Sequence, residues 1–517
     1  MYKRQNLAKA FSAKVTLSED GSTITAISFG AKAPIVVKTA SSKDTITGLL
    51  TDFNEYYVAG KGVTDEGKSV LVHDDQLTED INNKAYGTDG NTAQDQRALS
   101  DAQMNSTNTL YDALGPVLGK YYKDAADAGK LPKTAQFLSD MNKSASTGVA
   151  KATYQHPRPY VDRVNFNGTT LNMNGLKQTL NIKKVPGYEN FDWGDGEAPD
   201  NEYDGLYNSG SFPSGHTTFA FTQGAGLAYL LPELGPEIMT RVSEAGNNRI
   251  VLGVHYPLDI MGGHIAGQYG VATAVSGEKT AQEGAAARAE LVDYLTAQCK
   301  ADNHGDTLDA CITNTGANAA NGYRNDFTDE VSTKPVTDRA SALAAYKARM
   351  TYGFQATGTT GQAPVVPDSA VRMLDNVAAF KSLDSAQKKA VLAATEGDSG
   401  YPLDASSQGW ARVNLAAAYS AKVTLSADGK NVVKAEPGQA QASVVRETSG
   451  NNGNNGGNGN GGSNAGNIGV NNAAGRNPSG TQPLSKTGAD VSGIASAFIL
   501  IAAAGVTIMM IRRKHAI

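Results

Sequence analysis

Cysteine is nearly absent from this 517-residue sequence, which contains only Cys299 and Cys311 and no Cys-x-x-Cys pair. Two such cysteines cannot supply the four ligands of a structural zinc site, so that class of protein is excluded. They are close enough in sequence to form a loop-closing disulfide in an oxidising compartment, or to remain two free thiols. The sequence alone leaves both states open.

Positive charge is not in excess either. The formal net charge is −5, and no run of Lys or Arg occurs before the last residues of the chain. A nucleic-acid-binding protein usually has a basic patch, so we expect no nucleic-acid partner. Phosphate chemistry is not excluded, because a few converging cations and backbone N–H groups can hold a phosphate.

The N-terminus lacks the apolar stretch that would follow a basic segment in an export signal. Residues 6–21 recur almost unchanged as residues 414–429, which is an internal repeat. The second copy lies at the end of the predicted globular region. We therefore expect residues 1–43 to be the tail of an upstream domain of the same type, most of which is missing from this chain.

Long hydrophobic runs are scarce, and the one that could span a bilayer is residues 491–511, followed by Arg512-Arg-Lys. The basic cluster would stay on the cytoplasmic side. Ahead of this run, Leu484-Ser-Lys-Thr487-Gly488 resembles the LPxTG cell-wall sorting signal, with Ser485 where the signal has Pro.

That resemblance implies that a sortase joins Thr487 to peptidoglycan, so we expect residues 481–517 to form a sorting signal. The protein would then be extracellular and anchored to the wall of a Gram-positive bacterium. The alternative is simple retention by the C-terminal segment, and in either case this segment is the expected membrane contact. Residues 451–472 are almost entirely Asn and Gly, which predicts a flexible linker over 448–480.

The middle of the chain, residues 44–420, has apolar residues at three- and four-residue spacing, which predicts a mainly α-helical bundle. The expected helices are 99–128, 134–141, 216–231, 237–251, 258–275, 285–297, 369–379 and 385–395, the last capped by Asp384. Residues 165–210 are expected to be a long loop at the substrate entrance.

Alternating runs predict hairpins around two Asp-Gly turns, one of strands 14–17 and 23–27, the other of strands 421–425 and 431–433. The sequence thus predicts small β modules at both ends of the bundle, the second covering residues 421–447.

Three segments carry residues suited to phosphate chemistry. The first places Lys151 and Arg158 seven residues apart, next to Pro159. The second, Pro213-Ser-Gly-His216, leads into an apolar helix, whose N-terminus presents unpaired N–H groups to an anion. The third runs from Asn248-Arg249 to His255 and Asp259, where Pro257 predicts a new helix start. Each segment alone also fits an ordinary surface charge, helix cap or capping contact.

In this order and spacing, the segments resemble the Lys-x6-Arg-Pro, Pro-Ser-Gly-His and Ser-Arg-x5-His-x3-Asp signature of the type 2 phosphatidic acid phosphatase superfamily. The superfamily includes bacterial class A acid phosphatases, lipid phosphate phosphatases and vanadium haloperoxidases. The resemblance covers residues 151–267 and implies a helical bundle of the acid phosphatase and vanadium haloperoxidase type. Asn248 stands where the third motif usually has Ser.

The resemblance also implies roles. His255 would attack phosphorus to give a phosphohistidine, Asp259 would orient it, and His216 would be the general acid and then the base. The phosphate oxygens would be bound by a further set of residues: Lys151, Arg158, Ser214, Gly215 and Arg249. Neither a metal nor another cofactor would be needed. Of the remaining histidines, His264 is expected to be structural and His156 to line the pocket.

Lipid phosphatases of this superfamily have several membrane-spanning helices, whereas the only convincing span here is the C-terminal one. The resemblance therefore predicts an acid phosphatase that acts on small soluble phosphomonoesters. One alternative is a vanadium-dependent haloperoxidase, in which the same residues would hold vanadate through His255. The other is a non-catalytic wall-anchored surface protein, which the complete set of catalytic side chains disfavours.

Overall fold

The computed structural model describes the backbone of strands 13–17, 23–29 and 35–41, and residues 46–188, 202–404 and 408–448. The predicted linker beyond residue 448 and the sorting signal, with Leu484, Thr487, Gly488 and the run 491–511, lie outside the described residues. Within the described part, no helix is both long and apolar enough to cross a membrane.

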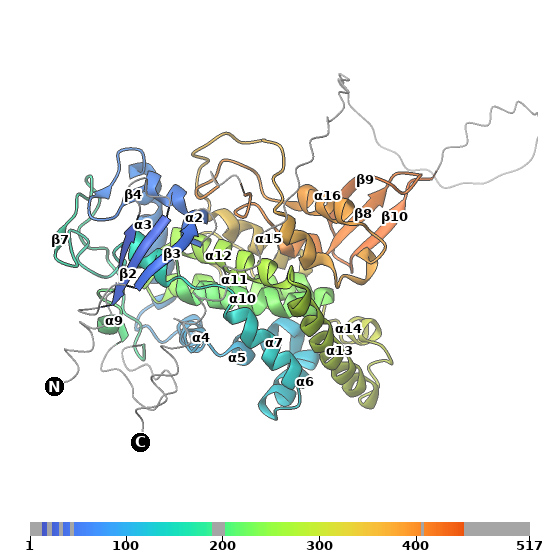
Figure 1. Cartoon of the computed structure of the whole chain (residues 1–517). Coiled ribbons are helices and arrows are strands. Elements are labelled where there is room, and N and C mark those ends of the chain that lie inside the picture. Colours follow the sequence, from blue (N-terminus) through green and yellow to red (C-terminus); the bar gives the residue numbers. More distant parts are fainter. Residues whose placement is uncertain are drawn as a thin grey trace, which may run out of the picture. The chain divides into compact units, whose positions relative to one another are not determined.

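The fold is mainly helical, as predicted (Figure 1). The α-helices are α2 (Ile46–Leu49), α3 (Lys68–Tyr86), α4 (Ala93–Ala102), α5 (Ser106–Leu110), α6 (Gly115–Asp127), α7 (Pro132–Asn142), α8 (Gly148–Tyr154), α9 (Glu202–Gly205), α10 (Gly215–Leu230), α11 (Gly235–Val251), α12 (Pro257–Val275), α13 (Glu278–Ala301), α14 (Leu308–Thr315), α15 (Arg339–Thr351), α16 (Ser385–Thr395) and α17 (Leu415–Tyr419). Short 3-10 helices are η2 (Thr51–Glu55), η3 (Tyr111–Leu114), η4 (Pro232–Leu234), η5 (Asp368–Leu374) and η6 (Ala378–Phe380).

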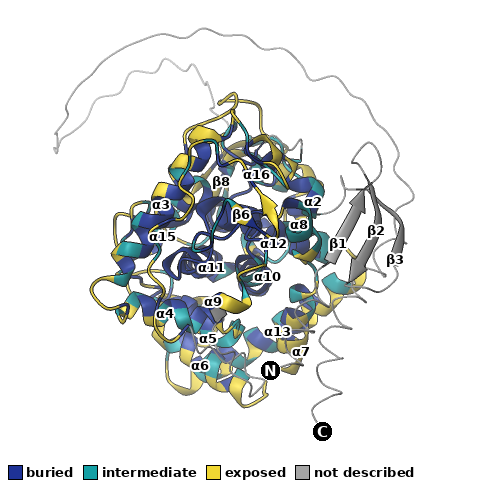
Figure 2. Ribbon diagram, turned by 90° about the vertical axis from the view of Figure 1, so that its left-hand side faces the viewer, coloured by how far each residue is buried: buried dark blue, intermediate teal, exposed yellow. Residues whose placement is uncertain are grey.

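Helices α10, α11 and α12 form the centre of the bundle and contact one another (Figure 2). Every residue of α11 is buried, and so are nearly all residues of α10 and α12. A helix that is buried all round lies in the core of a domain. Helices α6, α7 and α13 lie outside this centre and carry the exposed residues seen in yellow.

Glycines let α12 approach the start of α10 closely. A Cβ atom on Gly263 would lie 2.8 Å from the carbonyl oxygen of Ser214, and one on Gly267 would lie 2.4 Å from Cβ of Phe221. Real Cβ atoms are not found at such distances, so any larger residue would push the two helices apart. This close packing brings the start of α12 beside the start of α10, where two of the predicted motifs lie.

Two of the expected helices differ from the structure. The predicted helix 99–128 is divided into α4, α5, η3 and α6. Asn105 caps α5 by accepting a hydrogen bond from the backbone N–H of Asn108 at 3.1 Å, and Gly115 has a φ of +76°, so the chain turns at both points. The predicted helix 369–379 consists of η5 and η6, where backbone N–H groups bond three residues back rather than four.

Among the described residues, the strands form four small sheets. One three-stranded sheet has the order β1 (Ala13–Leu17), β2 (Thr23–Phe29), β3 (Ile35–Ser41). A second has the order β10 (Ser443–Arg446), β8 (Ala421–Leu425), β9 (Val432–Pro437). Both predicted hairpins are antiparallel pairs, β1 with β2 and β8 with β9. The third strands were not predicted.

The predicted loop 165–210 contains a hairpin of β6 (Asn165–Phe166) and β7 (Thr169–Thr170) as well as α9, and its residues 189–201 lie outside the described part.

Sheet β10-β8-β9 packs on α16, and β4 (Tyr57–Val58) pairs with β5 (Gly62–Val63) near α3. By their contacts, the described residues up to 447 belong to one compact unit. Cys299 at the end of α13 and Cys311 in α14 are joined by a disulfide, with a Cα–Cα distance of 5.9 Å.

Candidate active site

The first motif brings two cations to the site from α8 and the segment that follows it. Lys151 Nζ donates to the carbonyl oxygens of Gly210 and Ser211, both at 2.8 Å. These bonds use two of the three ammonium hydrogens. Arg158 is buried, and its Nε donates to the carbonyl oxygen of Ser209 at 3.0 Å. Both cations are thus fixed by the backbone of residues 209–211, just before the second motif.

The second motif forms the N-terminus of α10. The Ser214 hydroxyl accepts hydrogen bonds from the backbone N–H and the hydroxyl of Thr217, at 3.2 and 2.9 Å, so it is the N-cap of the helix. Gly215 and His216 follow as the first two helical residues, whose N–H groups have no acceptor within the helix. A Cβ atom on Gly215 would lie 3.8 Å from Cε of Lys151, which places this helix end beside the first motif.

The third motif spans the end of α11 and the start of α12. Asp259 is the third residue of α12, and its Oδ2 accepts from the backbone N–H of Tyr256 at 3.0 Å and lies 2.9 Å from Nδ1 of His255. Pro257 is the first residue of the helix, as predicted. The helix cap and the histidine contact are therefore made by the same carboxylate oxygen, and Asp259 is held in place by the helix start itself.

The partners of His255 define its tautomer. Arg158 Nη1 lies 3.2 Å from Nε2 of His255, and a guanidinium can only donate, so Nε2 is the acceptor and carries the lone pair. Nδ1 then carries the hydrogen and donates it to Asp259. The lone pair of Nε2 is thus directed toward the cations, which is the arrangement that a nucleophile for an anionic phosphorus centre needs.

Arg249 is the least satisfied of the cations. Its side chain is buried, and its Nε and Nη1 have no hydrogen-bond partner, while Nη2 donates to the hydroxyl of Tyr188 at 2.8 Å. The guanidinium also lies over the ring of Tyr188, with 5.4 Å from Cζ to the ring centroid. Buried N–H groups without acceptors are costly, so an anion at this place would be bound by groups already desolvated and oriented.

The pKa values of the site reflect burial among like charges. Burial, with Arg158, Lys151 and Arg249 nearby, holds the pKa of His255 well below its usual range. Burial and Arg249 do the same to the pKa of His216, and burial with Arg158 lowers that of Lys151. Burial raises the pKa of the Asp259 carboxyl. A bound dianion would offset the repulsion among the cations and raise the pKa values of the histidines and of Lys151 again.

Sequence comparison gives a family for this part of the chain. Residues 135–281 match the family model described as PAP2 superfamily. The chain carries a PAP2 superfamily domain. All eight residues predicted for phosphate chemistry lie inside the matched range: Lys151, Arg158, Ser214, Gly215, His216, Arg249, His255 and Asp259.

Two curated proteins resemble the chain in part. An acid phosphatase of Zymomonas mobilis subsp. mobilis is 40% identical over 62 residues, covering 12% of this chain and 24% of that protein. A non-specific acid phosphatase of Providencia stuartii is 27% identical over 189 residues, covering 35% of this chain and 61% of that protein. The matched segments therefore span less than two thirds of either relative.

Several residues around the PAP2 site were not predicted from the sequence. Tyr188 holds Arg249, and Ser211 connects two site residues, since its Oγ lies 2.9 Å from Nδ1 of His156 and donates to Oδ1 of Asp259 at 3.2 Å. Ala102 offers its carbonyl oxygen to Nε2 of His216 at 3.1 Å. Ser211 lies two residues before the second motif, which gave a weak sequence signal, whereas Tyr188 and Ala102 had none.

The remaining histidines of the PAP2 domain are buried. His264 stacks on Phe221 and its Nε2 lies 2.9 Å from the hydroxyl of Tyr346, so it packs inside the bundle as expected. His156 packs edge-on against Phe53 and Tyr57, and its pKa falls to about 3 because of burial. Among the described residues, no group of three or more His, Cys, Asp or Glu side chains is arranged to hold a metal ion.

Proposed function

We propose that this protein is a phosphatase that hydrolyses phosphomonoesters through a phosphohistidine. The observation that carries the proposal is the pairing of His255 with Asp259 at 2.9 Å, with Nε2 of His255 directed at Arg158. The PAP2 domain and the two partial relatives named as acid phosphatases support a phosphatase activity. The phosphohistidine and the residue roles are proposals that follow from the family resemblance, and the contacts of His255 with Asp259 and Arg158 support them.

In the first step, the phosphate binds among the cations, with Nε and Nη1 of Arg249 donating to its oxygens. Arg158 Nη1 then exchanges its contact with His255 for a phosphate oxygen, which releases the lone pair of Nε2. The bond from Nε2 to phosphorus forms as the bond from phosphorus to the leaving oxygen breaks. His216 gives its proton to that oxygen, so the alcohol leaves neutral.

In the second step, a water molecule attacks the phosphohistidine while His216 takes one of its protons. The phosphorus–nitrogen bond breaks, its electron pair returns to Nε2 of His255, and inorganic phosphate is released. Asp259 stabilises the imidazolium character that His255 acquires while it is phosphorylated. The cations and the N-terminus of α10 stabilise the charge on the equatorial oxygens throughout, which is the largest contribution expected in such a site.

The direct test is hydrolysis of p-nitrophenyl phosphate by the wild-type chain and by His255→Ala. We expect the variant to lose at least about 10³-fold in kcat, because it lacks the nucleophile. His264→Gln is the matched control, since His264 is buried in the same domain but outside the site, and it should keep wild-type kcat.

Acid quenching during turnover should give no stable label, whereas alkaline quenching should retain a phosphoryl group on the wild type and none on His255→Ala, as expected for a phosphohistidine. Full activity of His255→Ala would disprove the mechanism. Halide oxidation that requires added vanadate and peroxide, without ester hydrolysis, would instead identify a haloperoxidase.

The location at the cell surface is likewise a proposal and rests on the sequence at residues 484–488 and 491–511. The disulfide between Cys299 and Cys311 is consistent with an oxidising compartment. In a Gram-positive host, the phosphatase should be released from the wall fraction by a muramidase, and Thr487→Ala should shift it to the membrane fraction. Equal distribution of both proteins would argue against sortase anchoring.

A further inference from the structure

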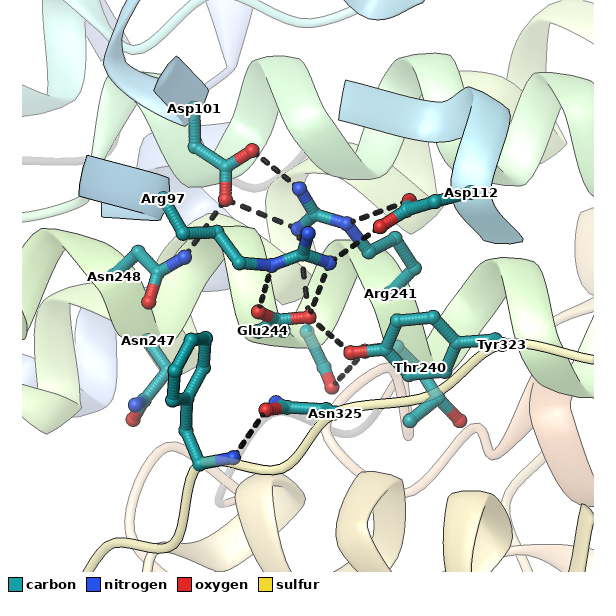
Figure 3. A network of polar contacts seen from close by, with 12 residues as sticks. Arg97, Asp101, Asp112, Thr240, Arg241, Glu244, Asn247, Asn248, Tyr323 and Asn325 are labelled. Atoms are coloured by element: carbon teal, nitrogen blue, oxygen red, sulfur yellow. Dashed lines mark hydrogen bonds and ion pairs between the residues drawn. The ribbon is translucent and has the colours of Figure 1, made fainter. Parts of the chain in front are cut away.

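A buried network of charged and polar residues lies next to the site, and of its labelled members Asn248 alone belongs to one of the three motifs (Figure 3). It joins α4 to α11 at two points. Arg97 of α4 pairs with Glu244 of α11, and Asp101 of α4 accepts from Arg241 of α11, Nη1 to Oδ2 at 3.0 Å and Nη2 to Oδ1 at 2.5 Å. The network therefore fixes the C-terminal end of α4 against the central helix.

Asn248 is the member of the network that belongs to the third motif. Its Nδ2 donates to Oδ2 of Asp101 at 2.8 Å, as Figure 3 shows. Asn248 is fully buried, and the residue after it is the phosphate-facing Arg249. The side chain that replaces the usual Ser of the superfamily signature thus contacts Asp101, so the amide is used to hold the end of α4.

The residue after Asp101 is Ala102, the last residue of α4, and its carbonyl oxygen lies 3.1 Å from Nε2 of His216. A carbonyl can only accept, so Nε2 of His216 carries a hydrogen and donates it. The other ring nitrogen, Nδ1, is then the one that exchanges a proton with the substrate. This contact also opposes the effect of burial and of the cations on the pKa of His216, because it favours the protonated ring.

The ring of His216 has little room to move. The cavity that borders it holds about 10 Å³ and is lined by Asp101 and Ala245 as well as by residues of α5 and α10. That space is too small for an imidazole to turn into. Close packing and the hydrogen bond to Ala102 therefore act together on the orientation of the ring.

From these contacts we infer that Asp101 and Asn248 are positioning residues for the general acid: together with Arg241 they hold the Ala102 carbonyl where it orients the imidazole of His216. This inference rests on the proposed phosphatase function. It gives a physical reason for Asn248, where the signature usually has Ser, because the longer amide side chain reaches Asp101. Asn248 thereby connects Arg249, the next residue, to the end of α4 that positions His216.

The test compares two esters that differ in their need for an acid. The leaving group of p-nitrophenyl phosphate departs easily as an anion, whereas glycerol 2-phosphate releases an alkoxide that must be protonated. We expect Asn248→Ala to reduce kcat/KM for glycerol 2-phosphate by about 10-fold or more, and for p-nitrophenyl phosphate by less than about threefold, because a general acid contributes about 10²- to 10⁴-fold. Asp101→Asn should show the same selectivity if it folds.

Two controls distinguish positioning from a general loss of structure. Glu237→Gln weakens another buried ion pair of α11, to Arg339 at 2.7 Å, and should leave the ratio of the two kcat/KM values unchanged. In a His216→Ala background, Asn248→Ala should cost less than about twofold on either ester, since the group it positions is gone.

Equal losses on both esters, or an undiminished loss in the His216→Ala background, would overturn the positioning role while the phosphatase function stands. A wild-type chain inactive on both esters would remove the proposed function and this inference with it.

Discussion

At the scale of single residues, the partners that hold the cations of the site are neutral groups within the part of the chain that the structure describes. Lys151 and Arg158 donate to backbone carbonyl oxygens, and Arg249 donates to a tyrosine hydroxyl. An acidic partner would neutralise each cation and weaken its attraction for phosphate. Among the described residues, the carboxylate that contacts His255 is that of Asp259, at 2.9 Å from Nδ1. The charge of the cations therefore remains available to a phosphate dianion.

Tyr188 offers a specific test of this arrangement. Tyr188→Phe keeps the ring under the guanidinium of Arg249 and removes only the hydroxyl. We expect KM and the Ki of inorganic phosphate to rise by about fivefold, with kcat changed less, since one hydrogen bond to a charged group is lost. Tyr160→Phe is the control, because its hydroxyl donates to the carbonyl of Tyr203 at 2.6 Å instead. Equal effects of the two variants would contradict the role of Tyr188.

The lowered pKa of His216 predicts how anion binding depends on pH. Without a bound anion, burial and Arg249 hold the pKa of His216 well below its usual range. A bound dianion would raise that pKa again. Protons are therefore taken up on binding, and affinity increases as the pH falls. Sulfate is a suitable probe, because it remains a dianion from pH 4 to 8. Its log Kd should change by up to about one per pH unit, and calorimetry should find less proton uptake with His216→Gln.

At the scale of secondary-structure elements, the distance between α10 and α12 controls the site. These helices carry His216 and Asp259 at their N-terminal ends, and glycines allow them to pack closely. Ser214 also connects them directly, because its backbone N–H donates to the carbonyl oxygen of Asp259 at 2.9 Å. A small separation of the helices would therefore move His216, the proposed acid, away from His255 and Asp259, the proposed nucleophile and its partner.

Gly267→Ala tests this dependence at a distance from the chemistry. The added methyl group would meet Cβ of Phe221 at 2.4 Å and force the helices apart. We expect a loss of about 1–3 kcal/mol in the free energy of unfolding, measured by urea denaturation, together with a lower kcat. Gly148→Ala, where the new Cβ would have its nearest neighbour at 3.9 Å, should change neither quantity. Wild-type stability of Gly267→Ala would show that the helices can adjust.

At the scale of the whole molecule, the internal repeat gives the same strand twice. The identical sequences of β1 and β8, Ala-Lys-Val-Thr-Leu, each pair antiparallel with the strand that follows. The third strands differ: β3 pairs with β2, whereas β10 lies parallel to β8. The hairpin is thus set by local sequence, and the third strand is set by its surroundings.

The disulfide stabilises the fold outside the site. It joins α13 to α14 across a separation of 12 residues, and neither helix carries a predicted site residue. Replacing Cys299 and Cys311 by Ala should cost about 3 kcal/mol by the loop-entropy relation, or roughly 3 °C in Tm for a unit of this size. The kcat for p-nitrophenyl phosphate should not change. A large loss of activity with unchanged Tm would indicate an unexpected link to the site.

Features that depend on residues close together in the chain could be predicted before the fold was known. Helix α16 spans Ser385–Thr395, as predicted, and its start is set by the capping box that Asp384 and Gln387 form within one turn. The start of α12 at Pro257 and the N-terminus of α10 after Ser214 follow from equally local signals. The candidate site residues were found because three motifs occur in the order and spacing of the superfamily signature. The structure brings the eight residues of these motifs together.

Contacts between segments far apart in the chain could not be predicted and become visible in the fold. Tyr188 meets Arg249 across 61 residues, and Ala102 meets His216 across 114. Such contacts depend on the angles between helices and on the backbone between them, which no local pattern encodes. The same holds for the break of the predicted helix 99–128, where packing requires turns that its apolar spacing does not reveal. The sequence thus identifies the residues of the site, and the packing of α4, α10, α11 and α12 gives them their orientation.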